Sequence, residues 1–171
     1  GSDFAVKLDD IDALNALLEK AVDDSKEILD FPIGHTAAHI NGDKQMTDVW
    51  RLPAIAKWEK SCGKHPTQKP LCVLSRIILA STKPGAWILD PFAGSSTTGI
   101  AANLLNRRFL GIEQEEEFVA MSKARREEIE RLDVFEKYRK KIADIMKAED
   151  LQIDWFGLHE PEPIEDLPFL L

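Results

Sequence analysis

One short stretch limits the fold of this chain more than any other. Residues 90–99 read DPFAGSSTTG, directly after a continuous apolar run at 86–89 and before a segment of helical character at 98–106. A strand, a glycine-containing turn and a helix in that order are typical of a βαβ unit. A second apolar segment at 108–113 predicts the next strand, so the pattern favours an α/β fold with a parallel sheet.

The N-terminal part of the chain carries a different pattern. Apolar residues recur at helical spacing between Ile11 and Val22, after two aspartates that suit a helix start, which predicts a surface helix over about 10–29. From 31 to 63 the Pro, Gly and polar content rises and no period persists. This segment is expected to be a loop, or to pack against something outside itself.

Helices are expected before and after the predicted strands along the chain. One begins at Pro70, with Thr67 as a candidate cap, and ends at 83–85; another covers 115–131. The apolar face of the first is formed by Leu71, Leu74, Ile77 and Ile78. The charged residues of the second are expected on a solvated face: Arg125, Arg126, Glu127, Glu128 and Glu130.

Charge is distributed unevenly along the 171 residues. The net charge is -8, yet residues 44–83 carry eight bases against two acids. An anionic partner should therefore meet the middle of the chain, although a solvated basic surface without a partner explains the same pattern. No apolar stretch is long enough to span a bilayer and no signal peptide is recognisable, so a cytoplasmic protein without membrane contact is expected.

Candidate metal ligands and stacking aromatics are sparse. Cys62 and Cys72 have neither zinc nor disulfide spacing, and His35 and His39 lack a third ligand, so no metal site is predicted. The tryptophans are Trp50, Trp58, Trp87 and Trp155. Trp87 is expected in the core because it lies in a strand, whereas the first two are weak candidates for stacking on bases.

The ligand class follows from what the glycine loop lacks. Gly99 is not followed by the Lys and Ser or Thr of a phosphate-binding loop, and Ser95 and Ser96 interrupt a dinucleotide fingerprint. Asp90 at the strand end would repel phosphate but suits an ammonium group, and Glu113 at the next strand end suits ribose hydroxyls. A nucleoside that carries an amino acid fits these features, and S-adenosylmethionine is such a molecule.

Three stretches also resemble a known family. GKHPTQKP at 63–70, DPFAGSSTTG at 90–99 and FLGIE at 109–113 look like motifs X, I and II of bacterial DNA amino-methyltransferases that modify adenine N6 or cytosine N4, in the beta order. TDVWRLP at 47–53 is similar too, so the resemblance covers roughly 47–130. It implies a partial Rossmann-like methyltransferase fold with S-adenosylmethionine as cofactor. Taken alone, HPTQKP could be a turn that merely begins a helix.

The resemblance also assigns candidate cofactor-binding residues. Asp90 and the loop from Phe92 to Thr97 would border the methionine part, and Glu113 would hold the ribose. The remaining candidates would close the pocket beside the carboxylate, where the positive charge of Lys69 suits an anion. The complete set is His65, Thr67, Gln68, Lys69, Asp90, Phe92, Ala93, Gly94, Ser95, Ser96, Thr97 and Glu113.

Two departures from the family pattern qualify this assignment. The family loop usually has glycine at the position of Ser96, where glycine would permit a positive φ or a close backbone approach. Serine can still adopt many loop geometries, so the expected consequence is at worst weakened binding. The chain also contains no Pro-Pro, whereas family members carry an Asp, Asn or Ser followed by Pro-Pro and an aromatic as their catalytic motif. Asp90-Pro91-Phe92 imitates half of that motif, but its place before the glycine loop makes it cofactor-binding. No catalytic residue is therefore predicted in this chain.

These expectations combine into one favoured function and two alternatives. The chain is predicted to be the C-terminal cofactor-binding part of a restriction–modification DNA methyltransferase, with adenine favoured, which meets DNA only through the complete enzyme and is inactive without its N-terminal catalytic half. A homodimer is one candidate assembly. The alternatives are a degenerate methyltransferase that serves as a non-catalytic partner subunit, and a Rossmann-like enzyme with another nucleoside cofactor.

The chain is expected to divide into three regions. Residues 1–46 form a helix and an irregular segment, 47–132 form the S-adenosylmethionine-binding region, and 133–171 form a helix and an acidic tail. The tail would be disordered, pack back on the domain or cap a neighbour.

Overall fold

A computed structural model describes residues 49–148 and 169–171, together with Ala16 and Glu19. Both isolated residues are helical and exposed, in agreement with the N-terminal helix expected over 10–29, whose other positions lie outside the described residues. His35, His39, Trp155 and most of the acidic tail also lie outside them.

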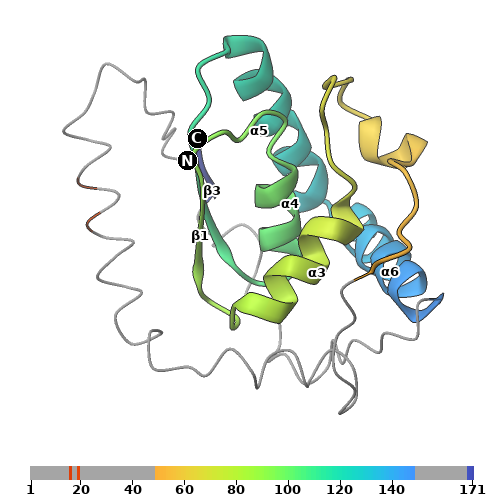
Figure 1. Cartoon of the computed structure of the whole chain (residues 1–171). Helices are drawn as coiled ribbons and strands as arrows, with labels where there is room; N and C mark the ends of the chain where they lie inside the picture. The colour runs from red at the N-terminus through yellow and green to blue at the C-terminus, as the bar shows by residue number, and fades with distance from the viewer. Residues whose placement is uncertain (1–15, 17–18, 20–48, 149–168) are drawn as a thin grey trace.

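A parallel sheet forms one side of the described structure (Figure 1). Its strands are β1 (Trp87–Asp90), β2 (Arg108–Gly111) and β3 (Phe169–Leu170), in the order β1-β2-β3. Trp87 pairs with Arg108 and Asp90 with Gly111, so the carboxyl ends of β1 and β2 lie side by side. Since β3 pairs with β2, the last residues of the chain pack back on the domain, which was one of the three expectations for the tail.

The described helices lie on one side of this sheet (Figure 1). They are the short 3-10 helix η2 (Lys57–Lys60), α3 (Leu71–Ser81), α4 (Thr97–Leu104), α5 (Glu116–Glu130) and α6 (Leu132–Ala148). The helices and strands expected between 70 and 131 are thus confirmed, with ends that differ by one or two residues. Together with the parallel sheet they confirm the α/β class and the partial Rossmann-like arrangement.

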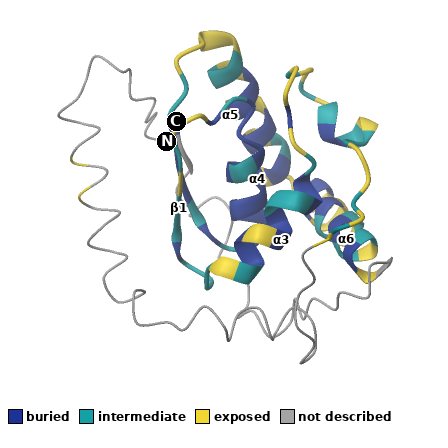
Figure 2. Cartoon of the chain, in the orientation of Figure 1, coloured by how far each residue is buried: buried dark blue, intermediate teal, exposed yellow. Residues whose placement is uncertain are grey.

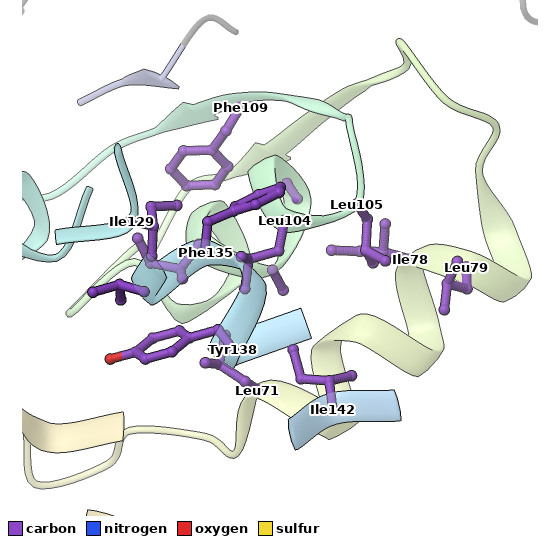
Figure 3. Packing of buried hydrophobic residues seen from close by; sticks show 14 of the residues in the cluster. Leu71, Ile78, Leu79, Leu104, Leu105, Phe109, Ile129, Phe135, Tyr138 and Ile142 are labelled. Carbon is purple, nitrogen blue, oxygen red and sulfur yellow. The ribbon is translucent and has the colours of Figure 1, made fainter. Parts of the chain in front are cut away.

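The core is built around α4, which contacts both β1 and β2 as well as α3, α5 and α6. Most of this helix is buried (Figure 2). Gly99, Ala101 and Ala102 are among its buried residues, and their small size lets neighbouring elements approach closely. The cluster also includes Phe109 of β2, Leu71 and Ile78 of α3, and a stripe along α6 (Figure 3). The α6 stripe consists of Val134, Phe135, Tyr138, Ile142 and Met146.

A buried arginine forms hydrogen bonds with the carboxyl ends of both α3 and α4. Arg107 is 1% exposed, and its guanidinium donates to Thr82 Oγ1 at 3.2 Å, to Thr82 O at 2.7 Å and to Leu105 O at 2.5 Å. Burial lowers the pKa of this guanidinium to about 10, so the group stays charged at neutral pH. These bonds satisfy carbonyls where the helices end.

Two expectations about single residues are wrong. Thr67 does not cap α3; Glu59 Oε2 accepts a hydrogen bond from Leu71 N at 2.7 Å instead, so a side chain twelve residues away supplies the missing acceptor. Trp87 is half-buried rather than part of the core, because its strand turns Ile88 toward the cluster and Trp87 toward the opposite face.

Trp50 and Trp58, the weak candidates for base stacking, both have partners within the chain. The guanidinium of Arg76 lies 4.2 Å from the ring centre of Trp50. Trp58 packs edge-on against Tyr138, with 4.8 Å between ring centres, and Lys141 Nζ lies 5.3 Å from its ring.

None of the helices in the described part of the chain is long and apolar enough to span a lipid bilayer. Within the same ranges, no three side chains of His, Cys, Asp or Glu gather as metal ligands.

Candidate cofactor site at the carboxyl edge of the sheet

The glycine loop connects the end of β1 to α4 and is fixed by backbone bonds to the neighbouring strand. Ile112 N donates to Asp90 O, and Ala93 N donates to Ile112 O, both at 3.0 Å. Ala93 is buried, and a side chain at Gly111 would meet it at 3.0 Å and the Phe109 ring at 2.7 Å. The loop therefore approaches β2 at a point where only glycine leaves room.

Asp90 holds the first turn of this loop. Its Oδ1 accepts from Phe92 N at 3.1 Å, and its Oδ2 accepts from Thr98 Oγ1 at 2.6 Å. An ionised carboxylate offers about four acceptor positions, so two partners leave capacity for a ligand donor. Phe92 follows with 88% of its side chain exposed at the same edge.

Glu113 connects the two strand ends. Its Oε2 accepts from Gly94 N at 2.7 Å, while its Oε1 accepts from Gln114 N at 2.9 Å and Glu115 N at 3.0 Å. The carboxylate thus lies against the backbone of the glycine loop and near the amino end of α5. The sequence predicted Glu113 as a ribose ligand, and the structure shows that its carboxylate contacts the glycine loop directly.

The second part of the loop adopts a left-handed backbone. Gly94 has φ +54, and Ser96 has φ 50 and ψ 41. The position where the family pattern has glycine is therefore one that favours glycine, as expected, and serine occupies it under strain. Ser96 is fully buried, and its Oγ has no hydrogen-bond partner among the described residues.

His65 brings the segment 61–69 to the glycine loop. A side chain on Gly94 would lie 3.0 Å from His65 Nε2, so the imidazole covers the loop at that point. The ring also packs edge-on against Phe118 at 4.3 Å between centres, and its Nδ1 accepts from Thr67 N at 3.3 Å. In a neutral imidazole the proton then lies on Nε2, on the side of the loop.

The other candidates of this segment point elsewhere or outward. Gln68 is buried and donates to Glu59 O at 2.9 Å, which fixes it to η2. Lys69 and Thr67 are exposed, and Lys69 Nζ donates to Thr67 O at 2.8 Å. The structure therefore brings together Asp90, the glycine loop, Glu113 and His65, whereas Gln68 belongs to the support of the segment.

Helix α5 contributes contacts that the sequence did not predict. Arg125 and Arg126 are 4% and 8% exposed, so the expectation of a solvated face is wrong for both. Arg125 donates to the glycine loop, and Arg126 pairs with Glu130 at 3.2 Å. The reason is that backbone carbonyls and hydroxyls of the loop supply acceptors for a buried cation.

Glu128 is half-buried and makes hydrogen bonds within the chain. Its Oε2 accepts from Ser61 Oγ at 2.6 Å and from Tyr138 OH at 3.1 Å, and the Tyr138 hydroxyl also lies 2.8 Å from Trp58 O. Burial raises the pKa of the Tyr138 phenol to about 12, so it remains a donor at neutral pH. This cluster joins α5, α6 and the start of the 61–69 segment.

Comparison with known proteins identifies the class. A family model described as DNA methylase (N6_N4_Mtase) matches residues 14–124, which is more than half of the chain. The chain belongs to this family, as its three motifs predicted.

The relatives are longer than this chain. It is 64% identical over 90 residues to Type II methyltransferase M2.MboI of Moraxella bovis, over 53% of this chain and 33% of that protein. It is 56% identical over 88 residues to Type II methyltransferase M2.DpnII of Streptococcus pneumoniae, over 52% of this chain and 33% of that protein. The chain therefore spans about a third of the length of these relatives.

A solved structure shows similar sequence over a shorter range. The crystal structure of an M1.HpyAVI-SAM complex is 46% identical, covers 37% of this chain and 33% of that one, and superposes with a TM-score of 0.35.

Proposed function

We propose that the carboxyl edge of β1 and β2 binds S-adenosylmethionine, and that the chain is the cofactor-binding portion of a restriction–modification DNA methyltransferase. The observation that carries this proposal is the Glu113 carboxylate bound to Gly94 N at 2.7 Å. This contact supports the proposal because a carboxylate, the kind of group that accepts hydrogen bonds from ribose hydroxyls, lies beside a glycine turn that begins at a second carboxylate, Asp90. Phosphates would be repelled at this edge, whereas an ammonium group and a ribose fit it.

The other candidate residues are proposed to contact the ligand or to shape the glycine loop. His65, Thr67 and Lys69 would border the ligand carboxylate, and Lys69 supplies the positive charge. Ala93, Ser95 and Thr97 are buried in the loop and would shape it. Phe92 is exposed and would contact the ligand directly.

The chemistry of the parent enzyme would need positioning more than acid or base. When bound, S-adenosylmethionine would supply the methyl group of its sulfonium for transfer to an exocyclic amine of the target base, with the sulfur as leaving group. The residues of this chain would bind and orient the cofactor, and the catalytic Pro-Pro motif would come from the rest of the enzyme. The sequence contains no Pro-Pro, so the chain alone is proposed to be inactive. The partner is DNA, with adenine the favoured target, and the enzyme would act in the cytoplasm.

Glu113→Ala tests the binding site. We expect its dissociation constant for S-adenosylmethionine to rise about tenfold or more, because a charge-assisted hydrogen bond worth about 1.5 to 3 kcal/mol is lost. Asp90→Ala should act similarly. Glu115→Ala is the matched control, since it removes an equal charge from an exposed side chain two residues away. Calorimetric titration measures the affinity of all three variants. Unchanged affinity in both Glu113→Ala and Asp90→Ala would contradict the assignment of these residues to the binding site.

Inactivity has its own test. The chain is incubated with duplex DNA and S-adenosylmethionine that carries a labelled methyl group. No incorporation above background is expected, and clear incorporation into DNA by the purified chain would disprove this part of the proposal.

A further inference from the structure

One stripe of α5 faces both segments of the candidate site. Each member lies three or four residues from another member, so all of them share one side of the helix. They are Phe118, Met121, Ser122, Arg125 and Glu128. Because charged residues surround this stripe in the sequence, its apolar periodicity is weak.

Two polar side chains of the stripe donate hydrogen bonds to the glycine loop. Ser122 Oγ donates to Gly94 O at 3.0 Å. Arg125 Nη1 donates to Ser95 O at 2.5 Å, to Thr97 Oγ1 at 3.1 Å and to Ser95 Oγ at 3.2 Å. The carbonyl oxygens of two successive loop residues are thus held by side chains one helical turn apart.

The other members bind the 61–69 segment. Phe118 packs against His65, and a side chain on Gly63 would lie 2.9 Å from Met121 Cε, so Met121 fills the space beside Gly63. Glu128 accepts from Ser61 Oγ at 2.6 Å. A single helix face therefore fixes two segments that are about 30 residues apart in the chain.

Arg125 is the costly member of this arrangement. The residue is 4% exposed, and moving a guanidinium out of water is unfavourable unless its hydrogen bonds and charge are compensated. An apolar side chain of similar size could fill the same space without that cost. What it could not do is donate to Ser95 O, Ser95 Oγ and Thr97 Oγ1 together.

We propose that Arg125 is a positioning residue of the cofactor site, which fixes the glycine loop in its ligand-binding geometry while the rest of the α5 stripe holds His65 over that loop. This inference rests on the proposed function. It assigns no contact between Arg125 and the ligand. The loop residues that Arg125 binds, Ser95 and Thr97, are among the cofactor-binding candidates.

The test compares Arg125→Met, Arg125→Lys and Arg126→Met in the full 171-residue chain. Arg126 is the matched control because it is adjacent, also buried and paired with Glu130 on α5 itself. We expect Arg125→Met to raise the dissociation constant for S-adenosylmethionine tenfold or more. Arg125→Lys should restore part of the affinity, since an ammonium group retains donors, and Arg126→Met should change it less than twofold.

A second measurement separates positioning from a general loss of stability. Hydrogen exchange at the amides of 94–97 should accelerate in Arg125→Lys, while the amides of Ile142 and Met146 in the core of α6 keep their protection. Slower folding or lower stability alone would change both groups of amides together. Melting temperatures of the three variants show whether each is folded at the temperature of titration.

The outcomes distinguish the two proposals. If the unmodified chain binds S-adenosylmethionine and Arg125→Met binds it equally well, the positioning role is wrong and the proposed function stands. If the folded, unmodified chain does not bind S-adenosylmethionine at all, the proposed function fails and this inference fails with it. Loss in Arg125→Met, partial recovery in Arg125→Lys and retention in Arg126→Met support the positioning role.

Discussion

The two segments that form the candidate site are held in different ways. In the glycine loop Ala93, Ser95, Ser96 and Thr97 are buried, and strand backbone, Glu113 and α5 all bind it. Most residues of the 61–69 segment are exposed (Figure 2). Its side-chain contacts with the rest of the chain include those of Ser61, His65 and Gln68. The glycine loop is therefore preorganised for binding, whereas the 61–69 segment is held at only a few residues and exposes its polar groups.

Gly94→Ala should have the largest effect, because it strains the loop and displaces His65 together. A residue other than glycine in the left-handed region costs about 1 to 2 kcal/mol, and the new side chain would lie 3.0 Å from His65 Nε2. We expect a lower free energy of unfolding in urea and at least a tenfold weaker affinity for S-adenosylmethionine.

Gly85→Ala is the control for that variant. Gly85 also has a positive φ, +79, but a side chain there meets nothing within 4 Å. It should lose a similar amount of stability and keep its ligand affinity. Equal affinity losses in the two variants would show that strain alone, and not the contact between His65 and the loop, governs binding.

Lys69→Ala examines the exposed segment and should have a smaller effect. Lys69 is exposed and donates only to Thr67 O among the hydrogen bonds of its side chain in the described residues. Exposed ion pairs contribute about 0.2 to 1 kcal/mol, so affinity for S-adenosylmethionine should fall less than tenfold, and less steeply still at high salt. The melting temperature should not change. A large loss of stability would mean that the segment is supported by Lys69 itself.

Ser96→Gly should give the smallest effect and the opposite sign. It relieves the left-handed backbone at φ 50 and removes a buried hydroxyl, while the added freedom of the unfolded chain offsets part of the gain. We expect stability to rise by about 0.5 to 1 kcal/mol in chemical denaturation. Ser96→Ala removes the hydroxyl but keeps the strain, so a similar gain in Ser96→Ala would assign the effect to the hydroxyl instead.

Much of the fold could be predicted from local pattern. The apolar run before Asp90 and the glycine loop after it fixed the order of β1, α4 and β2, because strand, turn and helix each leave a short-range signal. The location of Glu113 beside the loop was predictable, since parallel strands bring their carboxyl ends to one edge of the sheet. These features depend on residues close in sequence or on a general rule of parallel sheets.

The support of the site could not be predicted in the same way. Arg125 lies within a run of charged residues typical of a solvated helix, and its acceptors are 28 to 30 residues away in the loop. The cap of α3 was missed for the same reason, because Glu59 comes from η2 and replaces a local Thr67. A buried charge is recognisable only after its partners are placed in space.

The central claim is that the carboxyl edge of this sheet binds S-adenosylmethionine. Calorimetric titration of the folded chain with S-adenosylmethionine, and separately with NAD, tests it most directly. Saturable binding of S-adenosylmethionine with no binding of NAD is the predicted result. Binding of NAD alone, or of neither ligand by a chain whose circular dichroism shows it to be folded, would contradict the account.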